Sequence, residues 1–140
     1  MSFNCEMNSF VRILIRNFKK SENATMKKIY HLSTCDTCKR IINEINPSSE
    51  VILQDIKTTA ITPEQLEEMK QMAGSYESLF SKRARLYKER DLKNQQLTEE
   101  DYKNLILEHY TFLKRPVMIS GDQIFIGNSK KVVEAAKSVF

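Results

Sequence analysis

The chain of 140 residues has little of the material that several classes of protein need. It has no internal repeat and no low-complexity segment, and it holds only three glycines and three prolines. It contains no run of about 18 uncharged apolar residues, so we expect no segment that crosses a membrane. Its three cysteines are an odd number, which is a poor framework for a secreted domain held by disulfides. A reducing compartment suits such a chain, and we expect a cytoplasmic location.

What the chain does contain is the composition of one ordinary globular domain. Hydrophobic residues make up 41% and charged residues 29%, a balance that supplies a core and excludes an intrinsically disordered chain. The net charge of +4 permits an anionic partner. It is too small to indicate nucleic-acid binding, so we expect no direct contact with nucleic acid.

The first 25 residues differ from the rest. They combine apolar residues at helical spacing with basic ones: Val11, Arg12, Ile15, Arg16, Phe18, Lys19 and Lys20. A secretory signal would need a longer apolar stretch and a small-residue cleavage site, whereas a basic amphipathic helix can lie on a membrane surface or dock a partner. The segment that begins at Met26 looks like the natural start of a domain. We therefore interpret residues 1–25 as an N-terminal extension that is disordered or forms a loose basic helix. Cys5 in this extension is expected to be a thiol without a function. The domain itself is expected to span residues 26–140.

The beginning of that domain predicts a strand, a helix and a second strand. Residues 28–32 contain the β-formers of a short strand, and residues 51–53 read as another. The segment between them has the apolar face of a helix, made of Ile41, Ile42 and Ile45.

A helical block is expected over residues 57–110. Its first helix has a strong start, because Thr62 can cap it, Pro63 suits its first position and Gln65 can close a capping box. Thr98 can cap a further long helix in the same way.

Beyond the block the period changes to that of two short strands. Residues 117–119 and 124–126 are separated by a Ser-Gly-Asp turn, which predicts a hairpin. A last helix follows the Gly127-Asn128-Ser129 segment. The order β-α-β, helical insertion, β-hairpin, α is the thioredoxin-like arrangement. We therefore predict an α/β fold with a small mixed sheet flanked by helices.

The pair Cys35 and Cys38 follows the first strand and opens the first helix. A thiol becomes a nucleophile when it loses its proton, and the unpaired N–H groups and dipole at a helix N-terminus stabilise the thiolate. Cys35 sits at that end, and Cys38 lies nearly one turn further on the same side. This spacing lets Cys38 attack a mixed disulfide formed by Cys35.

Two other interpretations of the pair stay open. A zinc site needs a second pair of ligands, and the two histidines, His31 and His109, do not form one by their spacing, so we expect no metal. The two cysteines can also be buried thiols without chemistry.

Arg115, beside a proline, suits the bidentate binding of an oxyanion, although a solvated surface arginine fits the sequence too. His109 is interpreted as structural.

Three motifs occur in order along the domain, and together they resemble one family. They are Tyr30-His31 leading into Cys35-Asp36-Thr37-Cys38-Lys39, Ser81-Lys82-Arg83-Ala84-Arg85, and Lys114-Arg115-Pro116-Val117-Met118-Ile119. The chain is similar to the glutaredoxin-dependent arsenate reductases and their relatives, the Spx-type transcription regulators. The resemblance covers residues 26–140.

The resemblance implies a role for each matching position. Cys35 falls on the nucleophilic cysteine, and His31 on a histidine that helps to keep it ionised. Arg115 and Arg83 fall on two arginines that bind the oxyanion. Pro116 falls on the proline that is cis in thioredoxin folds and faces the active cysteine.

The chain also departs from the reductases in two ways. They resolve the cysteine with glutathione and lack a thiol at position 38, whereas this chain has Cys38, as the Spx-type proteins do. They carry a third arginine after the hairpin, where this chain has Ile126-Gly127-Asn128. Both departures count against reduction of arsenate itself.

The expected function is therefore a thiol–disulfide oxidoreductase of the arsenate reductase family, with Cys35 as nucleophile and Cys38 as resolving thiol. No tightly bound cofactor is expected, and thioredoxin, or glutathione with glutaredoxin, would serve as external reductant. The alternative is an Spx-like redox-sensing regulator that binds the α subunit of RNA polymerase.

Overall fold

The computed structural model describes residues 26–140, and the predictions made for residues 1–25, including Cys5, lie outside this part. The sheet has four strands in the order β2-β1-β3-β4. These strands are β1 (Lys27–His31), β2 (Ile52–Asp55), β3 (Val117–Ser120) and β4 (Gln123–Ile126). β1 pairs parallel with β2 and antiparallel with β3, which confirms the predicted small mixed sheet.

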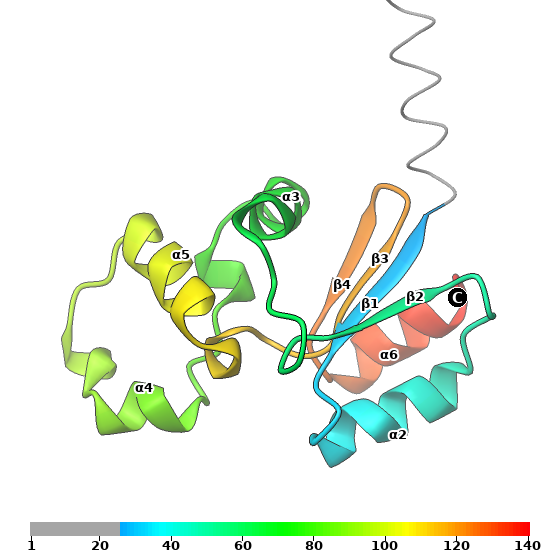
Figure 1. Cartoon of the computed structure of the whole chain (residues 1–140), viewed down its shortest axis with the longest axis horizontal. Helices are drawn as coiled ribbons and strands as arrows, with labels where there is room; N and C mark the ends of the chain where they lie inside the picture. Colours follow the sequence, from blue (N-terminus) through cyan, green and yellow to red (C-terminus); the bar gives the residue numbers. More distant parts are fainter. Residues whose placement is uncertain (1–25) are drawn as a thin grey trace, which may run out of the picture.

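Helices cover the two faces of the sheet in different ways (Figure 1). One face carries α2 (Asp36–Ile45) and α6 (Lys130–Lys137). The other face packs against the helical block that lies between β2 and β3 in the chain. The block contains α3 (Pro63–Ala73), α4 (Arg85–Glu89), α5 (Glu99–Glu108) and 3-10 turns at Glu77–Leu79, Leu92–Asn94 and Tyr110–Phe112.

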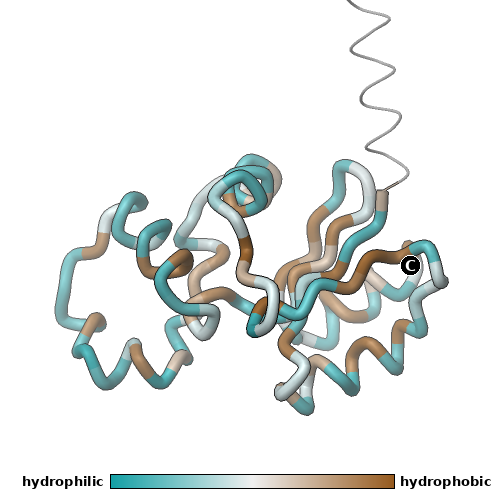
Figure 2. Tube along the Cα trace, in the orientation of Figure 1, coloured by the Kyte–Doolittle hydropathy of each residue, from teal (hydrophilic) through white to brown (hydrophobic). Residues whose placement is uncertain are grey.

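Alternation along the strands divides the core into two clusters. Ile29 and Met118, which are partners across β1 and β3, pack with Ile41 under α2 and α6. Their neighbours Tyr30 and Val117 face the other way and join the core of the helical block. Figure 2 shows the hydrophobic stretches of the strands between these layers. The sheet therefore lies between the two core clusters and contributes side chains to both.

The helix starts follow the local chemistry that the sequence predicts. The Thr62 side chain accepts a hydrogen bond from the Gln65 backbone, and the Gln65 side chain accepts one from the Thr62 backbone, so the capping box is confirmed. Pro63 occupies the first turn, and the helix ends at Gly74, whose φ of 96° suits a residue without a Cβ. Thr98 caps α5 with Asp101 in the same arrangement.

The structure corrects several details of the sequence prediction. β1 begins one residue earlier than expected and ends at His31, and β2 begins at Ile52 and continues to Asp55. α4, which is five residues long, and the 3-10 turns at Leu92–Asn94 and Tyr110–Phe112 were not predicted from the sequence. Segments this short carry too few residues for a helical period to be recognised.

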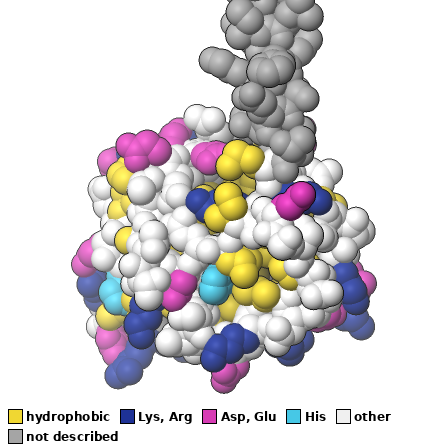
Figure 3. All heavy atoms as spheres, turned by 45° about the vertical axis from the view of Figure 1, so that its right-hand side comes forward, with side chains coloured by type: hydrophobic (Ala, Val, Ile, Leu, Met, Phe, Trp, Pro, Cys, Tyr) yellow, Lys and Arg dark blue, Asp and Glu magenta, His cyan; other side chains and the backbone are white. Residues whose placement is uncertain are grey.

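The edge strand β2 is incompletely covered. Ile52 and Leu53 are each 48% exposed, and Met26 at the start of the described chain is 54% exposed. Figure 3 shows hydrophobic side chains gathered on the face where β2 runs. Within residues 26–140, no helix combines the length and apolar character needed to cross a bilayer.

Candidate active site

Cys35 stands at the start of α2 as its N-cap residue. Its backbone N–H donates to the carbonyl of Leu32 at 3.0 Å, and its carbonyl accepts from the N–H of Lys39 at 3.1 Å. No side chain caps the helix, because the cap position holds the thiol itself. The sulfur therefore lies where the free N–H groups of the first turn converge.

The loop that carries Cys35 to the helix is held by Asp55. The Ser33 backbone N–H donates to Asp55 Oδ1 at 3.2 Å and the Ser33 hydroxyl donates to Oδ2 at 2.5 Å. The N–H of Lys57 donates to the same carboxylate at 3.2 Å. The Ser33 hydroxyl is the main cause of a lowered pKa at Asp55, with a smaller contribution from the nearby His31. Asp55 was not singled out from the sequence.

Several groups act on the pKa of Cys35. Partial burial opposes ionisation, but the hydrogen bonds that favour the thiolate outweigh it. They come from the backbone N–H and thiol of Cys38 and from the backbone N–H of Thr37, and the positive charge of Arg115 adds to them. The net result is a pKa below that of an ordinary cysteine, which increases the thiolate fraction at neutral pH.

Cys38 has the opposite environment. It is completely buried, in the core shared with the helical block, and both cysteines are free thiols. Burial raises the pKa of Cys38 to about 11, and its proximity to Cys35 adds to the rise, although a hydrogen bond from the Leu32 backbone and the charge of Arg115 oppose it. One cysteine of the pair is thus an ionisable thiol at the surface and the other a protonated thiol behind it.

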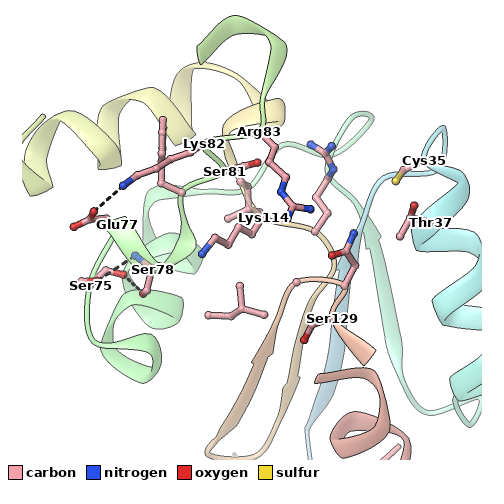
Figure 4. Close-up of a pocket in the computed structure, with 16 residues that line it drawn as sticks. Cys35, Thr37, Ser75, Glu77, Ser78, Ser81, Lys82, Arg83, Lys114 and Ser129 are labelled. Atoms are coloured by element: carbon pink, nitrogen blue, oxygen red, sulfur yellow. Dashed lines mark hydrogen bonds and ion pairs between the residues drawn. The ribbon is translucent and has the colours of Figure 1, made fainter. Parts of the chain in front are cut away.

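Cys35 opens onto a cavity of about 820 Å³ (Figure 4). One wall belongs to the helical block and includes Ser75, Ser78 and Arg83. The opposite wall belongs to the ends of the sheet and helices and includes Thr37 and Ser129. The cavity therefore lies at the junction between the insertion and the thioredoxin-like part.

The cavity is rich in positive charge. Four basic residues line it: Lys82, Arg83, Lys114 and Arg115. Lys82 is paired with Glu77, also in the lining, at 3.1 Å. Among the described residues, the other three basic side chains form no salt bridge. Such a surface attracts an anion or a negatively charged group of a larger ligand.

Arg115 connects the cavity to both sulfurs. Its Nη1 donates to the carbonyl of Thr111 at 3.4 Å, and its charge lowers the pKa of Cys35 and of Cys38. The peptide bond between Arg115 and Pro116 is cis. Pro116 is buried behind this bond, at the entrance to β3.

The structure brings most of the predicted residues together, with one exception. Cys35, Arg83 and Arg115 line one cavity, with Cys38 directly behind Cys35. His31 is not in the lining, and it contributes to the lowered pKa of Asp55, after the hydrogen bonds from Ser33 and Lys57. His109 lies elsewhere, stacked on Tyr110.

Sequence reasoning missed other lining residues, notably Lys82, Lys114, Thr37 and Ser129. Lys114 and Lys82 adjoin the two predicted arginines within the recognised motifs, and that adjacency was the available signal. The segment Ile126-Gly127-Asn128 also lines the cavity, so no arginine enters from this side. Across residues 26–140, no cluster of three His, Cys, Asp or Glu side chains is arranged to hold a metal ion.

Comparisons with known proteins agree with this architecture. The sequence model of the ArsC family matches residues 30–136. No curated protein matches the chain. The arsenate reductase from Vibrio cholerae has a similar structure, with a TM-score of 0.67 and 19% identity over 83% of this chain and 98% of that one.

Two further solved structures show the same likeness. The protein SACOL0876 from Staphylococcus aureus COL has a TM-score of 0.62 and 27% identity, covering 79% of this chain and 97% of its own. The arsenate reductase related protein from Brucella melitensis has a TM-score of 0.61 and 19% identity, covering 79% of this chain and 93% of its own. At under 25% identity, the likenesses to the Vibrio and Brucella proteins bear on the fold alone.

Proposed function

The chain belongs to the ArsC family, and from this premise we propose that it is a thiol–disulfide oxidoreductase in which Cys35 is the nucleophile and Cys38 the resolving thiol. One observation carries the proposal: Cys35 has a lowered pKa and faces a basic cavity, while Cys38, whose pKa is raised to about 11, is buried in the core. A two-cysteine exchange requires this difference, because one thiol must be ionised to attack the substrate and the other must stay protonated until the mixed disulfide has formed.

The reaction proceeds in two exchanges. The Cys35 thiolate attacks one sulfur of a disulfide, so that a bond forms between Cys35 and that sulfur while the other half leaves as a thiolate. Cys38 then loses its proton and attacks the sulfur of Cys35, which releases the second half. The substrate gains two electrons, and the protein is left with a Cys35–Cys38 disulfide. An external dithiol reductant of the thioredoxin or glutaredoxin type restores the free thiols.

Arg115 has two tasks in this scheme. Its charge favours the thiolate of Cys35 before attack, and the same charge near Cys38 lowers the pKa of that thiol, which assists the second step. We assign Arg83, in the facing wall, to the binding of an anionic group on the substrate. His31 is left without a role at the reacting sulfur.

The test is turnover of a neutral disulfide, bis(2-hydroxyethyl) disulfide, with arsenate in a parallel assay. Each is supplied with thioredoxin and its reductase, or with glutathione, glutaredoxin and glutathione reductase. Wild-type protein is expected to raise the rate of disulfide reduction above that of the donor system alone, and Cys35→Ser to leave the rate at that background. Cys38→Ser is expected to accumulate a mixed disulfide on Cys35, visible by mass spectrometry. Equal rates for wild type and Cys35→Ser would reject the proposal.

A second candidate is a redox-sensing regulator that binds the RNA polymerase α subunit. The observation that favours it is the composition of the cavity, where Ile126-Gly127-Asn128 supplies no third cation for arsenate, together with the presence of Cys38. It predicts that the α subunit is retained by the immobilised chain, and that oxidation of the cysteine pair changes the amount retained. Turnover without retention excludes it.

A further inference from the structure

The cavity beside Cys35 is larger than a simple oxyanion needs. Its volume of about 820 Å³ lies within the range of about 300–1,000 Å³ that is typical of sites for organic ligands. A single tetrahedral anion held by Arg115 would leave most of this space empty. The remainder reaches into the helical block as far as Ser75 and Ser78.

Lys114 occupies this remaining space. In Figure 4 its side chain extends from beside Arg83 toward Ser78, away from Cys35. Its backbone is fixed, because its N–H donates to the carbonyl of Leu79 at 2.8 Å and the neighbouring Leu113 pairs with Phe80. A rigid backbone thus presents a flexible ammonium group to the cavity.

The charge of Lys114 is free to act on a ligand. Lys82, the other lysine of the lining, is paired with Glu77 at 3.1 Å, whereas Lys114 forms no salt bridge with any described residue. The cavity therefore offers a second site for an anionic group, on a side chain separate from Arg115. A ligand that reacts with Cys35 and also binds Lys114 carries an anionic group outside its reacting atoms.

We propose that the substrate is a small organic disulfide bearing a carboxylate, with its S–S bond against Cys35 and the carboxylate bound by Lys114. The inference rests on the proposed function, and it specifies the substrate class. In the first exchange the Cys35 thiolate forms a bond to the sulfur of the carboxylate-bearing half, and the other half leaves as a thiolate. Lys114 takes no part in bond breaking; it positions the half that stays attached.

The test compares two disulfides of matched length. 3,3′-Dithiodipropionate carries carboxylates where bis(2-hydroxyethyl) disulfide carries hydroxyls. Each is mixed with excess reduced Cys5→Ser protein, in the absence of any donor system, and the rate of disulfide consumption gives a second-order rate constant. Lys114→Gln should slow the reaction of the dicarboxylate about fivefold, as expected for one partly exposed ion pair, and leave that of the neutral disulfide unchanged.

Lys93→Gln is the control, because it removes the same charge from an exposed lysine outside the cavity lining. It should change neither rate. If the neutral disulfide reacts but Lys114→Gln slows both disulfides equally or neither, the carboxylate site is wrong and the proposed function stands. If neither disulfide reacts with the wild-type thiols, the proposed function fails and this inference fails with it.

Discussion

Cys38 lowers the pKa of Cys35 through its backbone N–H and its thiol, so the buried member of the pair stabilises the ionised form of the exposed one. The same contact raises the pKa of Cys38, together with its burial. The two sulfurs are therefore unequal before any substrate arrives. In the proposed function, this inequality sets the order of action, with Cys35 first and Cys38 second.

Arg115→Ala should make Cys35 less reactive. The arginine charge is one of the causes of the lowered pKa of Cys35, so its loss raises that pKa and reduces the thiolate fraction at a given pH. We expect alkylation by iodoacetamide at pH 6.5 to slow about threefold, the effect of one partly exposed charge, as measured by mass spectrometry in a Cys5→Ser background. Arg85→Ala, which removes an arginine paired with Glu89 outside the cavity, should leave the rate unchanged. A rate unaffected by Arg115→Ala would contradict the electrostatic role.

The second exchange should be faster in alkali. Burial holds the pKa of Cys38 at about 11, so its thiolate fraction rises roughly tenfold per pH unit between pH 7 and 9. Closure of the Cys35–Cys38 disulfide from a preformed mixed disulfide should accelerate by about the same factor, followed by acid quench and mass spectrometry. A closure rate independent of pH over this range would show that deprotonation of Cys38 does not limit the step.

Asp55→Asn should destabilise the protein at neutral pH and have little effect in acid. The native hydrogen bonds from Ser33 lower the pKa of Asp55, so the carboxylate contributes stability above the pKa of the unfolded chain. That contribution is lost as the pH falls through the lower native value. Urea unfolding of wild type and variant at pH 7 and near pH 2.5 measures the gap in free energy, which should narrow in acid. A gap of equal size at both pH values would argue against an ionised acceptor.

Thr98→Ala should cost about 1 kcal/mol in the free energy of unfolding, because it removes the side chain that accepts from the Asp101 N–H at the start of α5. Ser49→Ala is the matched control, at an exposed position outside helices and strands, and it should stay within about 0.5 kcal/mol. Urea denaturation followed by circular dichroism measures both. Equal effects of the two changes would mean that the cap contributes nothing.

Phe80→Ala should cost about 3–5 kcal/mol. The ring is 1% exposed and packs against Tyr87, Tyr102 and Phe112 in the block. Since this change can prevent folding altogether, Phe80→Leu provides a milder version that keeps most of the buried volume and should lower stability by a smaller amount. Both are measured by urea unfolding, and a stable Phe80→Ala protein would mean that the aromatic cluster does not hold the block together.

Local signals in the sequence predicted most of the fold. Thr62, Thr98 and the strand patterns act on their immediate neighbours, so the helix starts and the hairpin were found where they occur. The cavity was harder to predict from the sequence, because it depends on contacts between segments that are distant along the chain. Arg83 and Lys114 meet through the bridge that joins residue 80 to residue 113, and nothing in either segment alone shows this.

The position of His31 in the site also depends on tertiary contacts that the sequence does not show. His31 lies four positions before Cys35, and the resemblance to the reductases implied a role for it at the sulfur. In the structure it stands at the end of β1 opposite Asp55 of β2. The strand pairing directs its influence to that carboxylate. Pairing of strands is a tertiary property, and a single sequence does not specify it.

The cavity is formed by two parts of the molecule, so the reactive thiols lie in one part and the basic residues proposed to bind the substrate lie in the other. The thiol pair belongs to the sheet and α2, whereas Arg83 and its neighbours belong to the inserted block. A substitution that destabilises the inserted block would therefore leave Cys35 able to react with small electrophiles but without selectivity among them. If the proposed function holds, such a change would remove substrate selectivity while the thiol stays reactive, and assays with iodoacetamide alone would not detect the loss.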